Sequence, residues 1–145
     1  MPLHIIKLCV GCESIADLEG WIAQEEAIAK KRGKAFEQIH VTRMMPKKVD
    51  EILDGGSMYW VIKGQVSCRQ PITDLKQFND RDGISRCAIH LESPLIPVTP
   101  RPYRAFQGWR YLEAKDAPPD LRSAGKGSTE MPEDLRRELA ELGLL

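Results

Sequence analysis

Between Arg101 and Leu112 the sequence concentrates residue types that bind ligands. This segment holds three arginines, four aromatic residues and no acidic residue. A guanidinium group donates paired hydrogen bonds to phosphate or carboxylate and also stacks on flat rings. The segment therefore predicts a binding surface for an anionic group or a flat base. The alternative is that its aromatic side chains pack on the core, with the arginines reaching past them to water.

Other basic and amide side chains could extend this surface. Arg69 and Arg86 are expected on the polar faces of two sheet strands. Amide groups such as those of Gln70 and Gln107 donate and accept together, which suits the edge of a base. The predicted ligand-binding set is Lys63, Arg69, Gln70, Arg101, Arg104, Gln107, Trp109 and Arg110. The alternative is a solvated basic face.

A second motif is the CxxC formed by Cys9 and Cys12, at the junction of a predicted strand and a predicted helix. A helix N-terminus lowers the pKa of a nearby thiol, so a redox pair is one interpretation. Zinc is another, with Cys68 and Cys87 as further ligands. Those two cysteines fall on apolar strand faces, where buried structural thiols are common. We expect mainly reduced structural thiols, no metal and no cofactor, with the redox interpretation left open.

No catalytic constellation is predicted. The sequence contains neither an HExxH motif nor a useful Ser-His-Asp order. His90 and Glu92 alternate on one predicted strand and could form an acid–base pair, although a solvated sheet face explains them as well. Residues 54–57 resemble a phosphate-binding turn, but they precede a strand and so lack a helix dipole.

Composition limits the class of protein. The chain has 145 residues, enough for one domain, and its 21 basic residues balance 21 acidic ones. Contact with a nucleic acid would therefore need a local basic patch. No run approaches the roughly 20 apolar residues of a membrane span, and the first residues do not resemble a signal peptide. These features predict a cytoplasmic protein with no membrane partner.

Periodicity predicts the elements that position these side chains. Strands are expected at residues 3–10, 35–44, 57–64, 66–72 and 84–92, and helices at 14–33 and 46–54. Ser14 is a predicted N-cap, and Trp60 is expected in a buried central strand while Trp109 lies nearer the surface. Four prolines between residues 94 and 102 restrict any strand there to a sheet edge.

These elements predict an α+β fold with a mostly antiparallel sheet. We expect one domain over residues 1–122, a flexible linker over 123–131 and an amphipathic C-terminal helix over 132–145.

Four segments resemble a bacterial family of uncharacterised proteins, domain of unknown function 1489. They are residues 6–11, 55–64, 69–70 and 106–112, and the resemblance extends to the Leu-Gly-Leu-Leu end. It implies a cytoplasmic bacterial protein and supplies no activity.

A further resemblance is to the EVE and ASCH branches of the PUA-like superfamily, which are small pseudo-barrels that hold RNA or modified bases. Lys7 and residues 14–18 are similar to the opening of EVE domains. The chain departs from that pattern at Gly55 and Gly56, where the superfamily usually has Gly-Asp, and in its neutral charge. The resemblance implies a pseudo-barrel with two early helices and a C-terminal helix.

The leading hypothesis is a non-catalytic module that binds RNA or a modified nucleobase. Arginines 69, 101, 104 and 110 would hold phosphates, while Tyr59, Trp60 or Trp109 would stack on a base. The alternatives are a thiol-disulfide oxidoreductase using Cys9 and Cys12, and a protein-interaction module whose terminal helix binds a partner.

Overall fold

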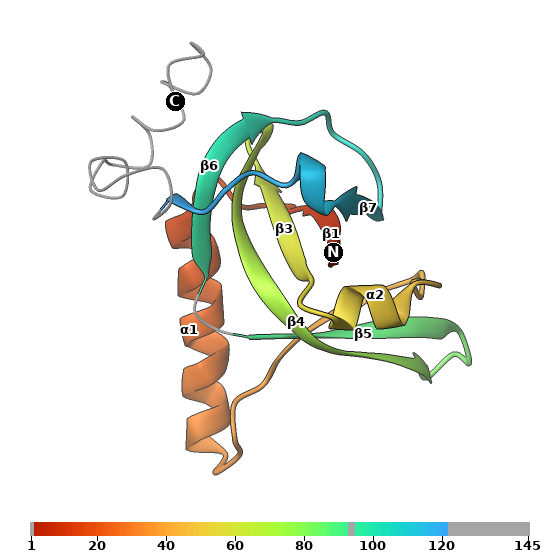
Figure 1. Ribbon diagram of the computed structural model, residues 1–145. Helices are drawn as coiled ribbons and strands as arrows, with labels where there is room; N and C mark the ends of the chain where they lie inside the picture. Colours follow the sequence, from red (N-terminus) through yellow and green to blue (C-terminus); the bar gives the residue numbers. More distant parts are fainter. Residues whose placement is uncertain (1, 93–94, 122–145) are drawn as a thin grey trace.

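A computed structural model describes residues 2–92 and 95–121 of the chain (Figure 1). The elements, in order, are β1 (Leu3–Leu8), α1 (Ile15–Lys31), β2 (Gln38–Thr42), α2 (Val49–Leu53), β3 (Ser57–Ile62), β4 (Gln65–Asn79), β5 (Ser85–Leu91), β6 (Ile96–Pro102), β7 (Trp109–Glu113) and a 3-10 turn at Ala114–Asp116. The predicted linker over 123–131 and the predicted helix over 132–145 lie outside the described residues.

The described residues form a single small α+β domain built on a mixed sheet of seven strands. The strand order is β2-β5-β4-β3-β1-β7, with β6 paired to β4 off this path. β1 and β3 are parallel, and the other strand pairs are antiparallel. The long strand β4 pairs with β3 and β6 through its first half and with β5 through its second (Figure 1). Each of these three pairings contains a register shift.

The sheet does not close into a barrel, because its outer strands β2 and β7 do not pair in the described part of the chain. Side chains from β7 nevertheless join it to the segment that leaves β2. The indole N–H of Trp109 donates to the carbonyl of Met44 at 2.8 Å. The hydroxyl of Tyr111 accepts from the backbone N–H of Lys47 at 2.9 Å and from that of Lys48 at 3.4 Å.

Apolar side chains bury both faces of the central strands. The larger cluster packs between the sheet and the first half of α1, and it includes Ile5, Trp60, Ile89 and Trp109. The smaller cluster lies on the opposite face and contains Ile6, Tyr59, Val61, Val66, Val98 and Leu112. All six residues of β3 are buried, which explains why this strand is the continuous apolar run of the sequence.

Helix α1 begins where its capping residues predict. The Ser14 hydroxyl accepts from the backbone N–H of Asp17 at 3.1 Å, and the Asp17 carboxylate accepts from the N–H of Glu13 at 3.0 Å. This reciprocal arrangement satisfies donors that a helix N-terminus leaves free. The residues of α1 that become buried are Ile15, Leu18 and Ile22, so the second half of the helix extends away from the core.

Two expectations about side-chain direction are wrong. Trp109 is 6% exposed, nearly as buried as Trp60 at 3%, because its indole is held by the Met44 carbonyl. His90 is also buried rather than solvated, since its Nδ1 forms a hydrogen bond with the carboxylate of Glu37. The expected acid–base pair of His90 with Glu92 therefore gives way to a contact with Glu37.

Candidate functional site

The predicted ligand-binding residues do not form one surface. Arg69 lies on β4, where Nε and Nη2 each donate to Asp120 at 2.9 Å and Nη1 donates to the hydroxyl of Ser57 at 2.7 Å. Arg86 lies on β5 and is paired with Asp80 at 2.6 Å. Both guanidinium groups are bound within the fold, and they do not share a surface as the sequence suggested.

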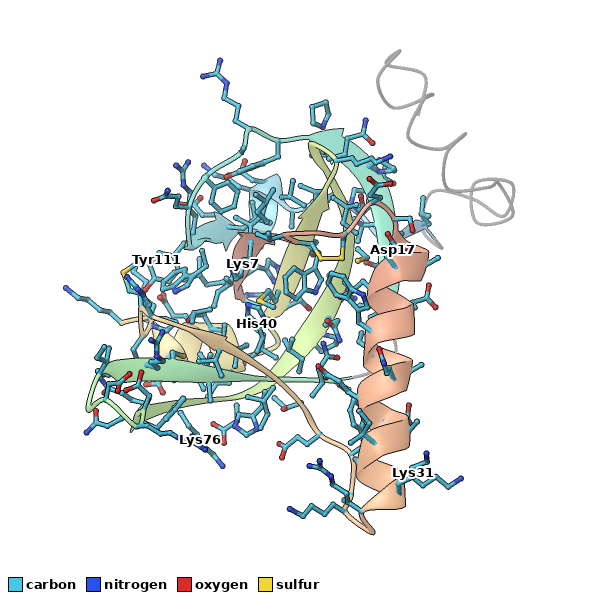
Figure 2. The ribbon with its side chains drawn as sticks, turned by 180° about the vertical axis from the view of Figure 1, so that it is seen from behind. Lys7, Asp17, Lys31, His40, Lys76 and Tyr111 are labelled. Atoms are coloured by element: carbon cyan, nitrogen blue, oxygen red, sulfur yellow. A yellow bond between two sulfur atoms is a disulfide. The ribbon has the colours of Figure 1, made fainter. Side chains whose placement is uncertain are left out.

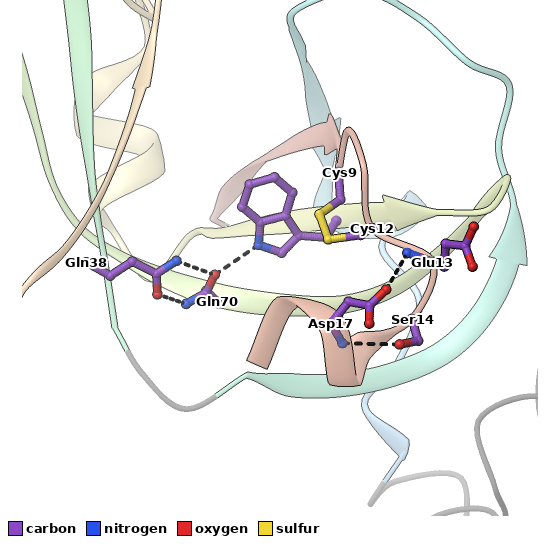
Figure 3. The surroundings of a disulfide bond; sticks show 8 residues. Cys9, Cys12, Glu13, Ser14, Asp17, Gln38 and Gln70 are labelled. Carbon is purple, nitrogen blue, oxygen red and sulfur yellow. Dashed lines mark hydrogen bonds between the residues drawn. A yellow bond between two sulfur atoms is a disulfide. The ribbon is translucent and has the colours of Figure 1, made fainter. Parts of the chain in front are cut away.

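Gln70 is fully buried and organises the interior instead of facing a ligand. Its side-chain oxygen accepts from the indole N–H of Trp60 at 2.9 Å, and its amide nitrogen donates to Gln38 at 2.6 Å (Figure 3). Two further hydrogen bonds tie this amide to its neighbours. A buried amide with several partners is costly to disturb, so this network fixes the position of Trp60.

The exposed remainder of the predicted set is Arg101, Arg104, Gln107 and Arg110, and we call these residues the arginine patch. The guanidinium of Arg110 lies 4.9 Å from the ring centre of Phe106. Lys63 is also exposed, and it pairs loosely with Glu13 at 3.9 Å. The three arginines form no ion pair among the residues that the structure describes.

A different part of the molecule forms a half-open pocket. A cavity of about 250 Å³ lies between the end of β1, the helix α1 and the strands β2 and β3. It is lined by Lys7, Leu8, Cys9, Val10, Leu18, Trp21, Ile22, Glu25, Gln38, His40 and Trp60. Figure 2 shows Lys7 and His40 near one another in the middle of the molecule. None of these residues belongs to the predicted ligand-binding set, although Trp60 is among the side chains that the sequence predicted to stack on a base.

Two tryptophans contribute to the walls of this cavity. Trp60 is held rigidly, by Gln70 at its N–H and by the edge-on ring of His40, whose centre lies 5.2 Å away. Trp21 is 45% exposed and can adjust. It lies beside Gly11, where a Cβ atom would come within 3.5 Å of the indole and where φ is +84°. A Cβ atom at that distance would make only an ordinary contact, so glycine is favoured here because it permits the left-handed turn.

Two polar side chains of the cavity, Lys7 and His40, have lowered pKa values. Burial lowers the pKa of Lys7, and burial followed by the positive charge of Lys7 lowers the pKa of His40 to about 4. His40 is therefore neutral at pH 7, and its Nε2 atom is buried without a hydrogen-bond partner in the structure. Lys7 forms no ion pair with any described residue. Glu25 supplies a carboxylate only at the exposed rim.

Cys9, which also lines the cavity, forms a disulfide with Cys12 (Figure 3). The expectation of reduced thiols is therefore wrong for this pair and correct for Cys68 and Cys87, which are free and buried. The turn at Gly11 places the two Cα atoms 5.7 Å apart, a separation that a disulfide can bridge. In the described part of the chain, no group of three or more potential metal ligands gathers.

The sequence carried a weak signal for this cavity. Lys7 interrupts a strand that is otherwise apolar on both faces, and it is the residue that the fold leaves half-buried without a counter-ion. Trp21 gave no signal of its own, because single exposed apolar residues are common on protein surfaces.

Comparisons with known proteins place the chain in a family without adding an activity. Among the described residues, no helix combines the length and apolar character needed to cross a membrane. Neither the curated proteins nor the solved structures gave a match. The family described as "Protein of unknown function (DUF1489)" matches residues 5–145, and the chain belongs to that family.

Proposed function

We propose that this protein is a non-catalytic module that binds a nucleobase, free or within RNA, in the cavity between Trp21 and Trp60. The observation that carries the proposal is the pairing of aromatic walls with polar groups that have no partner in the fold. Flat rings stack on aromatic side chains with about 1–3 kcal/mol per base. The Nε2 atom of His40, which has no partner in the fold, and the ammonium group of Lys7 offer hydrogen bonds to the edge of the base.

The size of the cavity favours a single base over a whole nucleotide. Pockets for drug-sized ligands span roughly 300–1,000 Å³, and this cavity holds about 250 Å³. A sugar and its phosphate would therefore remain outside. A base within RNA would enter only from a single strand, where it can leave its neighbours and turn into the protein.

The arginine patch is suited to hold the phosphates of such a strand. Alternation along β1 and β7 separates Arg110 of this patch from the cavity. Lys7 is opposite Trp109, whereas Arg110 is opposite Ile6 on the other face. Because β7 is an outer strand of the sheet, an RNA strand could pass around it from one face to the other. The base and the phosphates would then contact different faces of the same two strands.

Replacing Trp21 tests this proposal, because its exposure allows the change without loss of folding. Trp21→Ala should weaken binding of a short single-stranded RNA by about 1–3 kcal/mol, or roughly 5- to 150-fold. Ile28→Ala on the same helix is the matched control, since Ile28 is 46% exposed and Trp21 45%, and Ile28 does not line the cavity. Fluorescence titration with free bases and with oligonucleotides of each base measures both effects.

The proposal fails if the wild-type protein binds neither free bases nor oligonucleotides at low ionic strength. It also fails if Trp21→Ala and Ile28→Ala have the same effect on binding, because the cavity then has no part in it.

A thiol-disulfide oxidoreductase is the second candidate, favoured by the disulfide at the start of α1. Both cysteines are only 7% exposed, which hinders attack by the thiolate of another protein. We expect Cys9→Ser with Cys12→Ser to keep base binding and to lower the free energy of unfolding by about 2 kcal/mol. Insulin reduction that the wild-type protein catalyses and this variant does not would place the redox function first.

A further inference from the structure

We infer that the ligand of the cavity carries a negative charge, on an acidic group that sits between Lys7 and His40. This inference rests on the proposed function and narrows it, because it separates acidic rings from the neutral bases of ordinary RNA. It identifies Lys7 as the residue that selects the ligand, whereas the two tryptophans accept any flat ring.

The position of Lys7 is the first argument. A half-buried ammonium group loses hydration, and the fold normally compensates with a carboxylate or another acceptor. Lys7 has neither among the described residues. Its backbone neighbours are Trp60 on β3 and Trp109 on β7, and neither carries a charge. A ligand with an acidic group would supply the missing partner inside the cavity.

The groups facing Lys7 from the other elements support the same conclusion. Strand β2 contributes His40 and Gln38, which are neutral, and His40 feels the positive charge of Lys7. Helix α1 contributes Glu25, whose side chain is exposed at the rim. The interior of the cavity is therefore electropositive, and its acid lies at the solvent side. A low-dielectric environment of this kind strengthens the attraction of an anion.

Protonation of His40 should also report whether the bound ligand is charged. In the absence of a ligand, burial and Lys7 hold its pKa near 4. An anion placed between the two side chains favours the charged form of each, so it raises the pKa of both. Binding an acidic ring below about pH 6 should therefore be accompanied by proton uptake at His40, and binding a neutral ring should not.

The acid must be close to the ring, since the cavity is small. A carboxylate attached directly to a pyrimidine satisfies this condition. The phosphate of a nucleotide, which the size of the cavity leaves outside it, is the other source of an anion to be tested. Isothermal calorimetry with uracil-5-carboxylate and uracil-5-carboxamide separates charge from shape, because the two probes differ mainly in charge. Uridine monophosphate against uridine tests the phosphate source.

We expect the wild-type protein to bind the carboxylate at least tenfold more tightly than the carboxamide at pH 7. In Lys7→Met, which keeps the length of the side chain and removes its charge, this preference should fall to about one. Lys76→Met is the matched control, because Lys76 is an exposed lysine outside the cavity, and it should keep the preference. Thermal melting of each variant verifies that it is folded.

The outcomes are distinct. Equal binding of carboxylate and carboxamide would overturn the inference and leave base binding intact, and so would a preference that survives Lys7→Met. A gain for the monophosphate alone, lost in Lys7→Met, would support the anion site with phosphate as its source. If no ring binds in any form, the proposed function and this inference both fall.

Discussion

The arginine-rich segment at residues 101–112 and the cavity under α1 contain the same kinds of residue, and the fold uses them differently. In the segment, Trp109 and Tyr111 form hydrogen bonds that join β7 to the chain leaving β2, and the arginine patch faces solvent together with part of Tyr111. In the cavity, Trp60 and Trp21 form walls with free polar groups between them. The difference teaches that a tryptophan becomes a binding residue only where the neighbouring polar groups are not already satisfied within the fold.

The largest expected effect tests the structural side of this comparison. Trp109→Ala removes a buried aromatic side chain and the hydrogen bond to the Met44 carbonyl, so it should lower the free energy of unfolding by about 3–5 kcal/mol. Urea denaturation measures this loss. Trp21→Ala is the counterpart in the cavity wall and should cost much less, because Trp21 is exposed. Similar losses of unfolding free energy in the two variants would show that Trp109 contributes no more to stability than Trp21 in the cavity wall.

The second effect concerns the titration of the cavity. The folded pKa of His40, about 4, lies below its ordinary value of 6.5, so the unfolded chain binds more protons between these values. Stability should therefore rise with pH across that window and be lost as the pH falls. His40 should contribute about 2 kcal/mol to this rise, which is less than the full shift implies because the ring is only partly buried.

Denaturation of His40→Gln between pH 4 and 7 tests this prediction, because glutamine does not titrate. The slope of stability against pH should flatten in this variant. Part of the slope that remains is due to His4, because burial, and after it the positive charge of Arg69, also lowers the pKa of His4. A variant whose slope equals that of the wild-type protein would show that His40 is not held neutral.

The smallest effect on stability is expected at the arginine patch. Arg104→Ala with Arg110→Ala should leave the free energy of unfolding within about 0.5 kcal/mol of the wild type, since both side chains are exposed. Each lost phosphate contact should instead reduce the log–log salt slope of single-stranded RNA binding by about 0.7. Binding of a free base should not change, because neither arginine lines the cavity and Arg110 lies on the opposite face of β7 from Lys7 and Trp109.

Filter binding at several salt concentrations measures the slope, and calorimetry with a free base supplies the control. A double variant with an unchanged slope would restrict the function to small ligands. A double variant that also loses free-base binding would show that the arginine patch and the cavity act as one binding site.

Several elements were determined by the sequence alone. The N-cap of α1 at Ser14, the buried run of β3 and the burial of Cys68 and Cys87 all agree with the structure. The prolines between residues 94 and 102 likewise leave β6 paired with β4 alone among the named strands. These features depend on backbone geometry and on hydrophobic periodicity within a few residues, so they can be read along the chain.

The cavity was decided by tertiary structure. Lys7 and His40 meet because the bent sheet brings β1 and β2 toward one another without pairing them, and no local pattern encodes that distance. Trp109 is buried where its indole N–H donates to the carbonyl of Met44. That acceptor lies 65 residues earlier in the sequence, so no local pattern could have indicated it. Gln70 changes from a predicted surface amide to the partner of Trp60 and Gln38 for the same reason. A polar side chain is free to bind a ligand only when no distant part of the chain has already satisfied it, and that depends on the complete fold.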